Sequence, residues 1–194
     1  MGIDVDDGLG YARVPASAWG LRCATLEDAP VLEALIEESV RALCRGHYSD
    51  AQIDGALGTA FGLDRELIAD RTYFVAATAE AVVGCGGWSR RRTLFGGDRQ
   101  PGRVSALLDP AVDAARVRAF FVKPAWARRG IGRALIERCE AEARAHGFKA
   151  IELMATLPGH ALYRAMGYAG DARQEHVLPG GVPIAFIPMR RVLA

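Results

Sequence analysis

An apolar run that passes through an arginine- and glycine-rich turn into a long amphipathic stretch constrains the fold of this chain most. Residues 117–122 (VRAFFV) predict a central β-strand. Residues 132–146 predict a helix, because apolar residues recur there at helical spacing and Gly147 follows as a stop. The connecting sequence Arg-Arg-Gly-Ile-Gly occupies residues 128–132. A strand, a short turn and a helix in this order indicate an α/β protein.

The remaining segments predict one domain over residues 21–194, preceded by a tail or an added first strand over residues 1–20. Residues 90–115 are too polar and too rich in turn residues for a core element, so they predict either a binding loop or a solvated insertion. The other predicted elements are helices at 25–43 and after Ser49, a turn capped by Asp64, strands at 73–77, 82–88 and 150–155, a short helix at 160–166, and strands at 175–178 and 183–189.

Composition excludes several classes of protein. With 24 basic and 23 acidic residues in 194, the net charge of +1 argues against a nucleic-acid-coating protein. No apolar run is long enough for a membrane span, and the acidic N-terminus lacks the features of a signal peptide, so we expect a cytoplasmic protein without membrane contact. The cysteines lack metal-ligand spacing, which predicts reduced thiols and no metal site; they are Cys23, Cys44, Cys85 and Cys139.

The turn itself predicts an anion site. Glycines at 130 and 132 remove side chains where the first amides of the helix point outward. Those amides and the positive end of the helix dipole favour a bound phosphate, and Arg128, Arg129 and Arg133 add cationic donors. The turn is neither a P-loop nor a dinucleotide fingerprint, because it lacks the lysine of the first and the third glycine of the second.

Two ordered motifs resemble those of the GNAT superfamily of N-acetyltransferases. The turn is similar to motif A of that family, Arg/Gln-x-x-Gly-x-Gly/Ala, between its fourth strand and third helix. Downstream, residues 161–168 (ALYRAMGY) resemble the segment Ala-x-x-Tyr-x-x-x-Gly-Phe/Tyr. Residues 21–29 are similar to the opening of the family domain. One difference is Ala127, which stands where relatives carry Arg or Gln three positions before the first glycine.

The resemblance implies a mixed, mostly antiparallel central sheet, splayed between its fourth and fifth strands and flanked by about four helices. It implies acetyl-CoA as co-substrate, a small-molecule or peptide amine as acceptor, and no metal. A homodimer is one oligomeric state consistent with the resemblance. The implied pyrophosphate site consists of Arg128, Arg129, Gly130, Ile131, Gly132 and Arg133, the pantetheine site includes Phe121 and Val122, and Tyr163 is the implied general acid.

Alternatives remain open at this stage. Tyr163 is also consistent with a core tyrosine, and the whole fold with a non-catalytic acyl-CoA sensor. The acceptor ammonium must lose a proton before it attacks. Candidates for the base that takes this proton are His47 with Tyr48, Glu152, His160 and His176.

Overall fold

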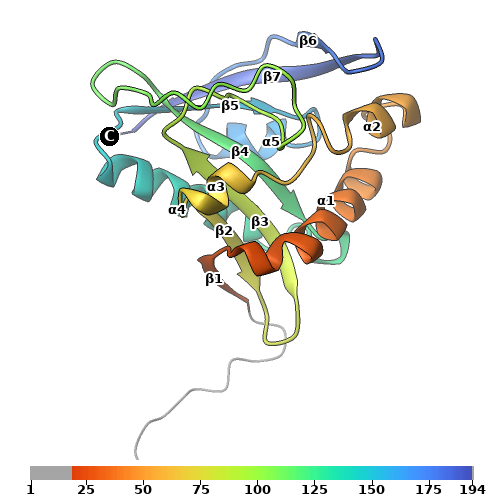
Figure 1. Ribbon diagram of the computed structural model, residues 1–194, viewed down its shortest axis with the longest axis horizontal. Coiled ribbons are helices and arrows are strands. Elements are labelled where there is room, and N and C mark those ends of the chain that lie inside the picture. Colours follow the sequence, from red (N-terminus) through yellow and green to blue (C-terminus); the bar gives the residue numbers. More distant parts are fainter. Residues whose placement is uncertain (1–18, 194) are drawn as a thin grey trace, which may run out of the picture.

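Seven strands form one sheet in the order β1-β2-β3-β4-β5-β7-β6, with helices on both faces (Figure 1). The structure, a computed structural model, describes residues 19–193. The strands are β1 (Gly20–Cys23), β2 (Tyr73–Ala77), β3 (Val82–Ser89), β4 (Ala115–Val122), β5 (Ala150–Ala155), β6 (Gln174–Val177) and β7 (Pro183–Val192). The helices are α1 (Ala29–Leu43), α2 (Asp50–Ala56), α3 (Arg65–Ala69), α4 (Ile131–Ala145) and α5 (His160–Ala165), with 3-10 turns η1 (Leu26–Asp28) and η2 (Pro124–Trp126).

The capping residues explain where several helices begin. Ser49 and Gln52 form a complete capping box at the start of α2, with hydrogen bonds of 3.2 and 2.9 Å. Asp64 caps α3 by accepting from the Leu67 amide at 3.2 Å. The described part of the chain therefore has five α-helices rather than about four, because the turn predicted after Asp64 continues as a short helix.

One pair of neighbouring strands is parallel and short. All neighbours in the sheet run antiparallel except β4 and β5. These two pair only over residues 115–117 of β4 and 151–153 of β5. The C-terminal part of β4 therefore separates from β5, which confirms the mixed, mostly antiparallel sheet splayed between its fourth and fifth strands.

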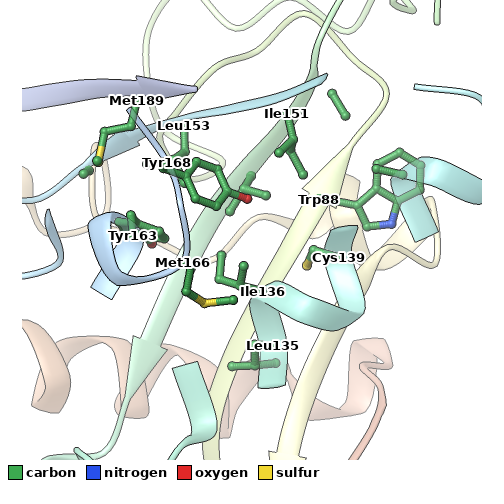
Figure 2. Close-up of a cluster of buried hydrophobic side chains, with 14 of the residues drawn as sticks. Trp88, Leu135, Ile136, Cys139, Ile151, Leu153, Tyr163, Met166, Tyr168 and Met189 are labelled. Atoms are coloured by element: carbon green, nitrogen blue, oxygen red, sulfur yellow. The ribbon is translucent and has the colours of Figure 1, made fainter. Parts of the chain in front are cut away.

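The two faces of the sheet bury two apolar cores. On the α4 face, Trp88, Leu135 and Ile151 are fully buried beside Met166 and Tyr168 (Figure 2). Trp88 is therefore a packing residue of this core. On the opposite face, α1 and α2 pack over the sheet through a second cluster that includes Leu32, Leu35, Ile36, Ile53 and Phe186.

The long segment between β3 and β4 is folded onto the protein by ion pairs. Arg91 makes a two-pronged pair with Asp70, at 2.6 and 2.8 Å. Arg103 and Arg118 both reach Asp64, whose side chain is completely buried. These contacts are those of a docked loop rather than a solvated insertion, and Arg91 neutralises Asp70 instead of remaining a free charge.

Two sequence expectations concern the ends and surface of the chain. Of the tail predicted over residues 1–20, residues 1–18 lie outside the described residues, whereas Gly20 begins β1. Among the helices of residues 19–193, none combines the length and the apolar character that a bilayer crossing requires.

Candidate active site

A β-bulge opens the free edge of β4. Cys85 of β3 pairs with Phe121 and Gly87 with Arg118, so two β4 residues lie opposite the single residue Gly86. Ala119, in the bulge, has a φ of +59°, which is left-handed and costly for alanine. The bulge begins two residues beyond Val117, the last β4 residue paired with β5, and changes the direction of the strand where the sheet separates.

Beyond the bulge, the main chain of β4 has no strand partner on the β5 side. The Val122 amide points to that side, where it donates to Ser39 Oγ of α1 at 3.3 Å. Lys123 instead donates to the Val83 carbonyl of β3. The β4 edge thus offers main-chain groups along an open gap, and its side chains Phe121 and Val122 are only half-buried.

The turn after β4 exposes a row of backbone donors. Arg128 and Gly130 have φ values of +64° and +83°, and Gly130 is the N-cap of α4. No amide from Arg128 to Arg133 makes a hydrogen bond with any part of residues 19–193. A β-carbon at Gly130 would meet no atom within 4 Å, so no protein atom obstructs this position. Free amides at the positive end of a 15-residue helix have the geometry and the potential that favour an anion.

Arginine side chains surround this turn. Arg128, Arg129 and Arg133 are exposed, and the Arg129 guanidinium lies over the Trp126 ring at 4.9 Å from its centroid. Arg133 lies 3.8 Å from Glu137. Ala127, the residue that departs from the family pattern, donates its amide to the Pro124 carbonyl and is unavailable as an anion donor. The structure thus brings together all six turn residues that the sequence identified.

Tyr163 belongs to α5, whose Leu162 lies close to the start of α4. A β-carbon at Gly132 would lie 2.9 Å from Leu162 of α5, so glycine allows this close approach. The Tyr163 ring is 8% exposed and packs edge-on against Tyr168 with centroids 5.8 Å apart (Figure 2). Its hydroxyl has no hydrogen-bond partner among the described residues. Burial raises the pKa of Tyr163 well above its ordinary value, so its proton is held at neutral pH.

A small cavity of about 60 Å³ connects these elements. It extends from Tyr163 and the β4 bulge to three phenylalanines from separate segments: Phe61, Phe95 and Phe186. The only titratable side chains in its wall are Arg118 and Tyr163. Sequence reasoning did not identify the phenylalanines, because nothing in their local sequence indicates that they meet.

A larger groove of about 790 Å³ lies on the α1 side of the molecule. Phe61 borders both this groove and the small cavity. The charges in the groove are mostly paired: Arg41 with Glu37 and Asp54, and Arg65 with Glu33 and Asp98.

The candidate bases have different environments. His47 is exposed, whereas Tyr48 is buried, donates to the Ala185 carbonyl at 2.8 Å and accepts from the Leu157 amide at 2.9 Å. Burial raises the pKa of Tyr48 to about 12, so this hydroxyl stays protonated at neutral pH. It links two main-chain segments and does not act as a base. Glu152 is engaged by Arg116 and Arg190.

The two other candidate histidines, His160 and His176, also have different surroundings. His160 Nε2 lies 3.0 Å from the Gly170 carbonyl and 3.1 Å from Asp171. His176 packs on Phe95 with ring centroids 4.8 Å apart, and its Nε2 is buried without a partner in the described chain. Burial lowers the pKa of His176, so it is neutral near pH 7 and lies one ring away from the cavity.

Cysteine and acidic side chains form no metal centre within residues 19–193, since no group of three or more His, Cys, Asp or Glu residues has suitable geometry there. All four cysteines are free thiols. Burial raises the pKa of Cys44 to about 11 and that of Cys85 to about 12, so neither is a reactive thiolate.

Solved structures share this architecture. A GCN5-related N-acetyltransferase from Rhodopseudomonas palustris is 22% identical, with a TM-score of 0.69 over 92% of this chain and 98% of its own. The PaiA N-acetyltransferase from Thermoplasma acidophilum, solved with coenzyme A, is 14% identical, with a TM-score of 0.60 over 90% of this chain and 99% of its own. YncA from Salmonella typhimurium, solved with acetyl-CoA, is 17% identical, with a TM-score of 0.60 over 92% of this chain and 95% of its own.

These likenesses establish the fold. A search of curated proteins found no match to the sequence. The sequence model of the acetyltransferase (GNAT) family, however, matches residues 38–168, which span β2 to β5 and both motifs. Since this match covers more than half of the chain, the protein belongs to the GNAT family of acetyltransferases.

Proposed function

We propose that this protein transfers an acetyl group from acetyl-CoA directly to a primary amine of a small molecule or peptide. One observation carries the proposal: the turn with unbonded amides directly follows β4, the strand that separates from β5, and β4 and Tyr163 line the same cavity. The free amides suit a diphosphate, and the open strand edge suits an arm that contains amides. The Tyr163 hydroxyl suits the thioester, because it can give a proton to the departing sulfur. The residues present therefore fit coenzyme A.

The turn is the proposed pyrophosphate site. The amides of Arg128, Arg129, Gly130, Ile131, Gly132 and Arg133 supply donors, and the α4 dipole supplies positive potential. The arginine side chains contribute charge-assisted hydrogen bonds to the phosphates. Gly130 is essential in this scheme because its left-handed backbone turns the amides outward.

The open edge of β4 is the proposed site of the pantetheine arm, near Phe121 and Val122. Main-chain groups on this side lack a strand partner, so an amide-containing chain can add there as a strand would. A main-chain N–H at this edge polarises the thioester carbonyl as an oxyanion donor. The long 3.3 Å bond between the Val122 amide and Ser39 is weak enough to exchange for such a ligand.

Tyr163 is the proposed general acid. As the amine nitrogen forms its bond to the carbonyl carbon, the carbon–sulfur bond breaks, and Tyr163 gives its proton to the departing sulfur. The phenolate then regains a proton from solvent. The nitrogen, which is cationic after its attack, loses one proton to solvent and becomes the amide nitrogen. Because neither Arg118 nor Tyr163 accepts a proton at neutral pH, the acceptor loses its ammonium proton before it reaches the cavity wall.

The setting we propose is the cytoplasm, which suits four cysteines that are all free thiols. The transfer needs no metal, since the main chain and Tyr163 supply the stabilising and proton-donating groups.

Calorimetry with acetyl-CoA and detection of released coenzyme A in the presence of amines test this function. We expect binding of acetyl-CoA together with amine-dependent release of the thiol. Failure to bind acetyl-CoA contradicts the proposal altogether. Binding without turnover across amino acids, polyamines, alkylamines and peptide amines instead identifies an acyl-CoA sensor.

A further inference from the structure

Three aromatic rings from separate segments line one part of the cavity. Phe61 and Phe186 meet edge-on with centroids 5.9 Å apart, and Phe95 lies 5.4 Å from Phe186. Phe61 and Phe186 belong to the core on the α1 face, and Phe95 packs against that core. Tyr163 and Leu153, which also line the cavity, belong to the core on the α4 face. Residues of both cores therefore line the cavity.

Phe95 is held in this wall by its neighbours in the segment between β3 and β4. Arg118 donates to the Thr93 carbonyl at 2.5 Å, and Arg103 donates to the Gly96 carbonyl at 2.9 Å. Both arginines also bind Asp64, at 2.5 and 3.0 Å. Two carbonyls that flank Phe95 are thus anchored to one buried carboxylate.

The same segment is bonded to the loop that carries Phe61. The Gly97 amide donates to the Thr59 carbonyl at 2.7 Å, and the Asp98 amide donates to the Leu63 carbonyl at 2.8 Å. A β-carbon at Gly97 would lie 2.7 Å from the Gly62 main chain, so the two backbones are in direct contact. Phe61 and Phe95 are consequently fixed relative to one another.

No uncompensated charge faces this part of the cavity among the described residues. Arg118, whose side chain is 1% exposed, is the only ionised side chain in the wall. Its guanidinium donates hydrogen bonds to Asp64, Glu66 and the Thr93 carbonyl. A carboxylate or a second ammonium carried into this space would lose its hydration without gaining a partner.

We infer that Phe61, Phe95 and Phe186 form the acceptor end of the cavity and select amines whose carbon skeleton next to the nitrogen is apolar, with Phe95 as the specificity-determining residue. The inference rests on the proposed function and names its substrate class. A volume of about 60 Å³ admits only the amine and its nearest carbons, so the selection acts on those atoms.

Matched amines test this selection in the wild-type protein. Butylamine is compared with 1,3-diaminopropane, which has the same length but ends in an ammonium. 2-Phenylethylamine is compared with phenylalanine, which adds a carboxylate beside the amine. We expect kcat/KM to be at least about tenfold higher for the apolar member of each pair, after allowance for the fraction of free amine at the assay pH.

Variants of Phe95 test the residue itself. Phe95→Ala should lower the ratio of kcat/KM for butylamine over 1,3-diaminopropane at least about fivefold without changing the KM for acetyl-CoA. Phe95→Leu should restore most of the ratio. Leu107→Ala is the matched control, because Leu107 lies in the same segment but is 60% exposed, and it should leave the ratio unchanged.

The outcomes separate this inference from the proposed function. If acetyl-CoA does not bind, the proposed function fails. If acetyl-CoA binds but the charged member of either pair is preferred, or neither apolar amine is acetylated, the selection by the three rings is wrong. An unchanged ratio in a folded Phe95→Ala protein likewise overturns the role of Phe95.

Discussion

The Tyr73 hydroxyl donates a 3.0 Å hydrogen bond to the Ala119 carbonyl, at the left-handed residue of the β4 bulge. Tyr73 belongs to β2, so its side chain crosses β3 to reach β4. Gly87 of β3 allows this crossing, since a β-carbon there would lie 2.8 Å from the Tyr73 ring. The bond satisfies a carbonyl at the point where β4 turns away from β5, and thereby supports a strained residue beside the cavity.

Tyr73→Phe should destabilise the protein by about 1–3 kcal/mol, because it removes a buried partner of the Ala119 carbonyl. The measurement is the free energy of unfolding in urea. Tyr163→Phe is the control, because the Tyr163 hydroxyl has no partner within the described chain. Equal losses in the two variants would show that the bond does not support the bulge.

Tyr163→Phe should lower kcat about 10²- to 10⁴-fold if Tyr163 protonates the departing sulfur. Its affinity for acetyl-CoA should stay unchanged, because the phenol ring and its packing on Tyr168 are retained. Single-turnover rates and calorimetry measure the two quantities separately. An unchanged kcat means that water supplies the proton and that Tyr163 is a core residue.

Gly130→Ala should weaken acetyl-CoA binding at least about tenfold and cost about 1–2 kcal/mol of stability, because alanine is strained at a φ of +83°. Relief of this strain rotates the amides of the turn away from the ligand. Gly102→Ala provides the control, since Gly102 has a φ of +74° and open space around it, but lies outside the turn. It should lose similar stability and bind acetyl-CoA normally; equal affinities in both variants would contradict the anion site.

The pH dependence of kcat/KM should follow the acceptor amine. With butylamine we expect a rise of about tenfold per pH unit between pH 7 and 9, because only the free base reacts and the cavity wall holds no base. Tyr163 should cause no decline in this range, because burial raises its pKa and keeps it protonated. A plateau above pH 6 to 7 would instead identify a base on the enzyme, for which His176, with its lowered pKa, is the group to substitute.

Asp70→Asn should destabilise the protein at pH 7 by about 1–3 kcal/mol, because it breaks the two-pronged bond to Arg91. That bond lowers the pKa of Asp70 below 3.8, so its stabilisation is complete above pH 4 to 5 and is lost as the pH falls through the lowered value. The difference between wild type and variant should therefore shrink towards pH 2. Asp171→Asn is the control, since its carboxylate is exposed and its bond to Arg164 should contribute less.

Local features of the sequence were sufficient to predict the turn and the helix that follows it. Gly130, the helix that follows and the stop at Gly147 depend on dihedral preferences and hydrogen bonds within a few residues, and all were confirmed. The same is true of the capping box at Ser49 and Gln52. The position of Tyr163 beside the cavity was reached through the family motif rather than through local chemistry.

Tertiary structure decided what surrounds the reacting atoms. Phe61, Phe95 and Phe186 meet only because the sheet order and the docked segment bring three distant stretches together. Arg118 and Asp64, the ion pair that holds this segment, are separated by 54 residues, and neither has a sequence neighbour that indicates the other. The sequence alone therefore determined the turn that we propose as the phosphate site, since backbone amides at a helix start are a local property. The chemistry of the acceptor end depends on long-range packing and became visible only in the folded chain.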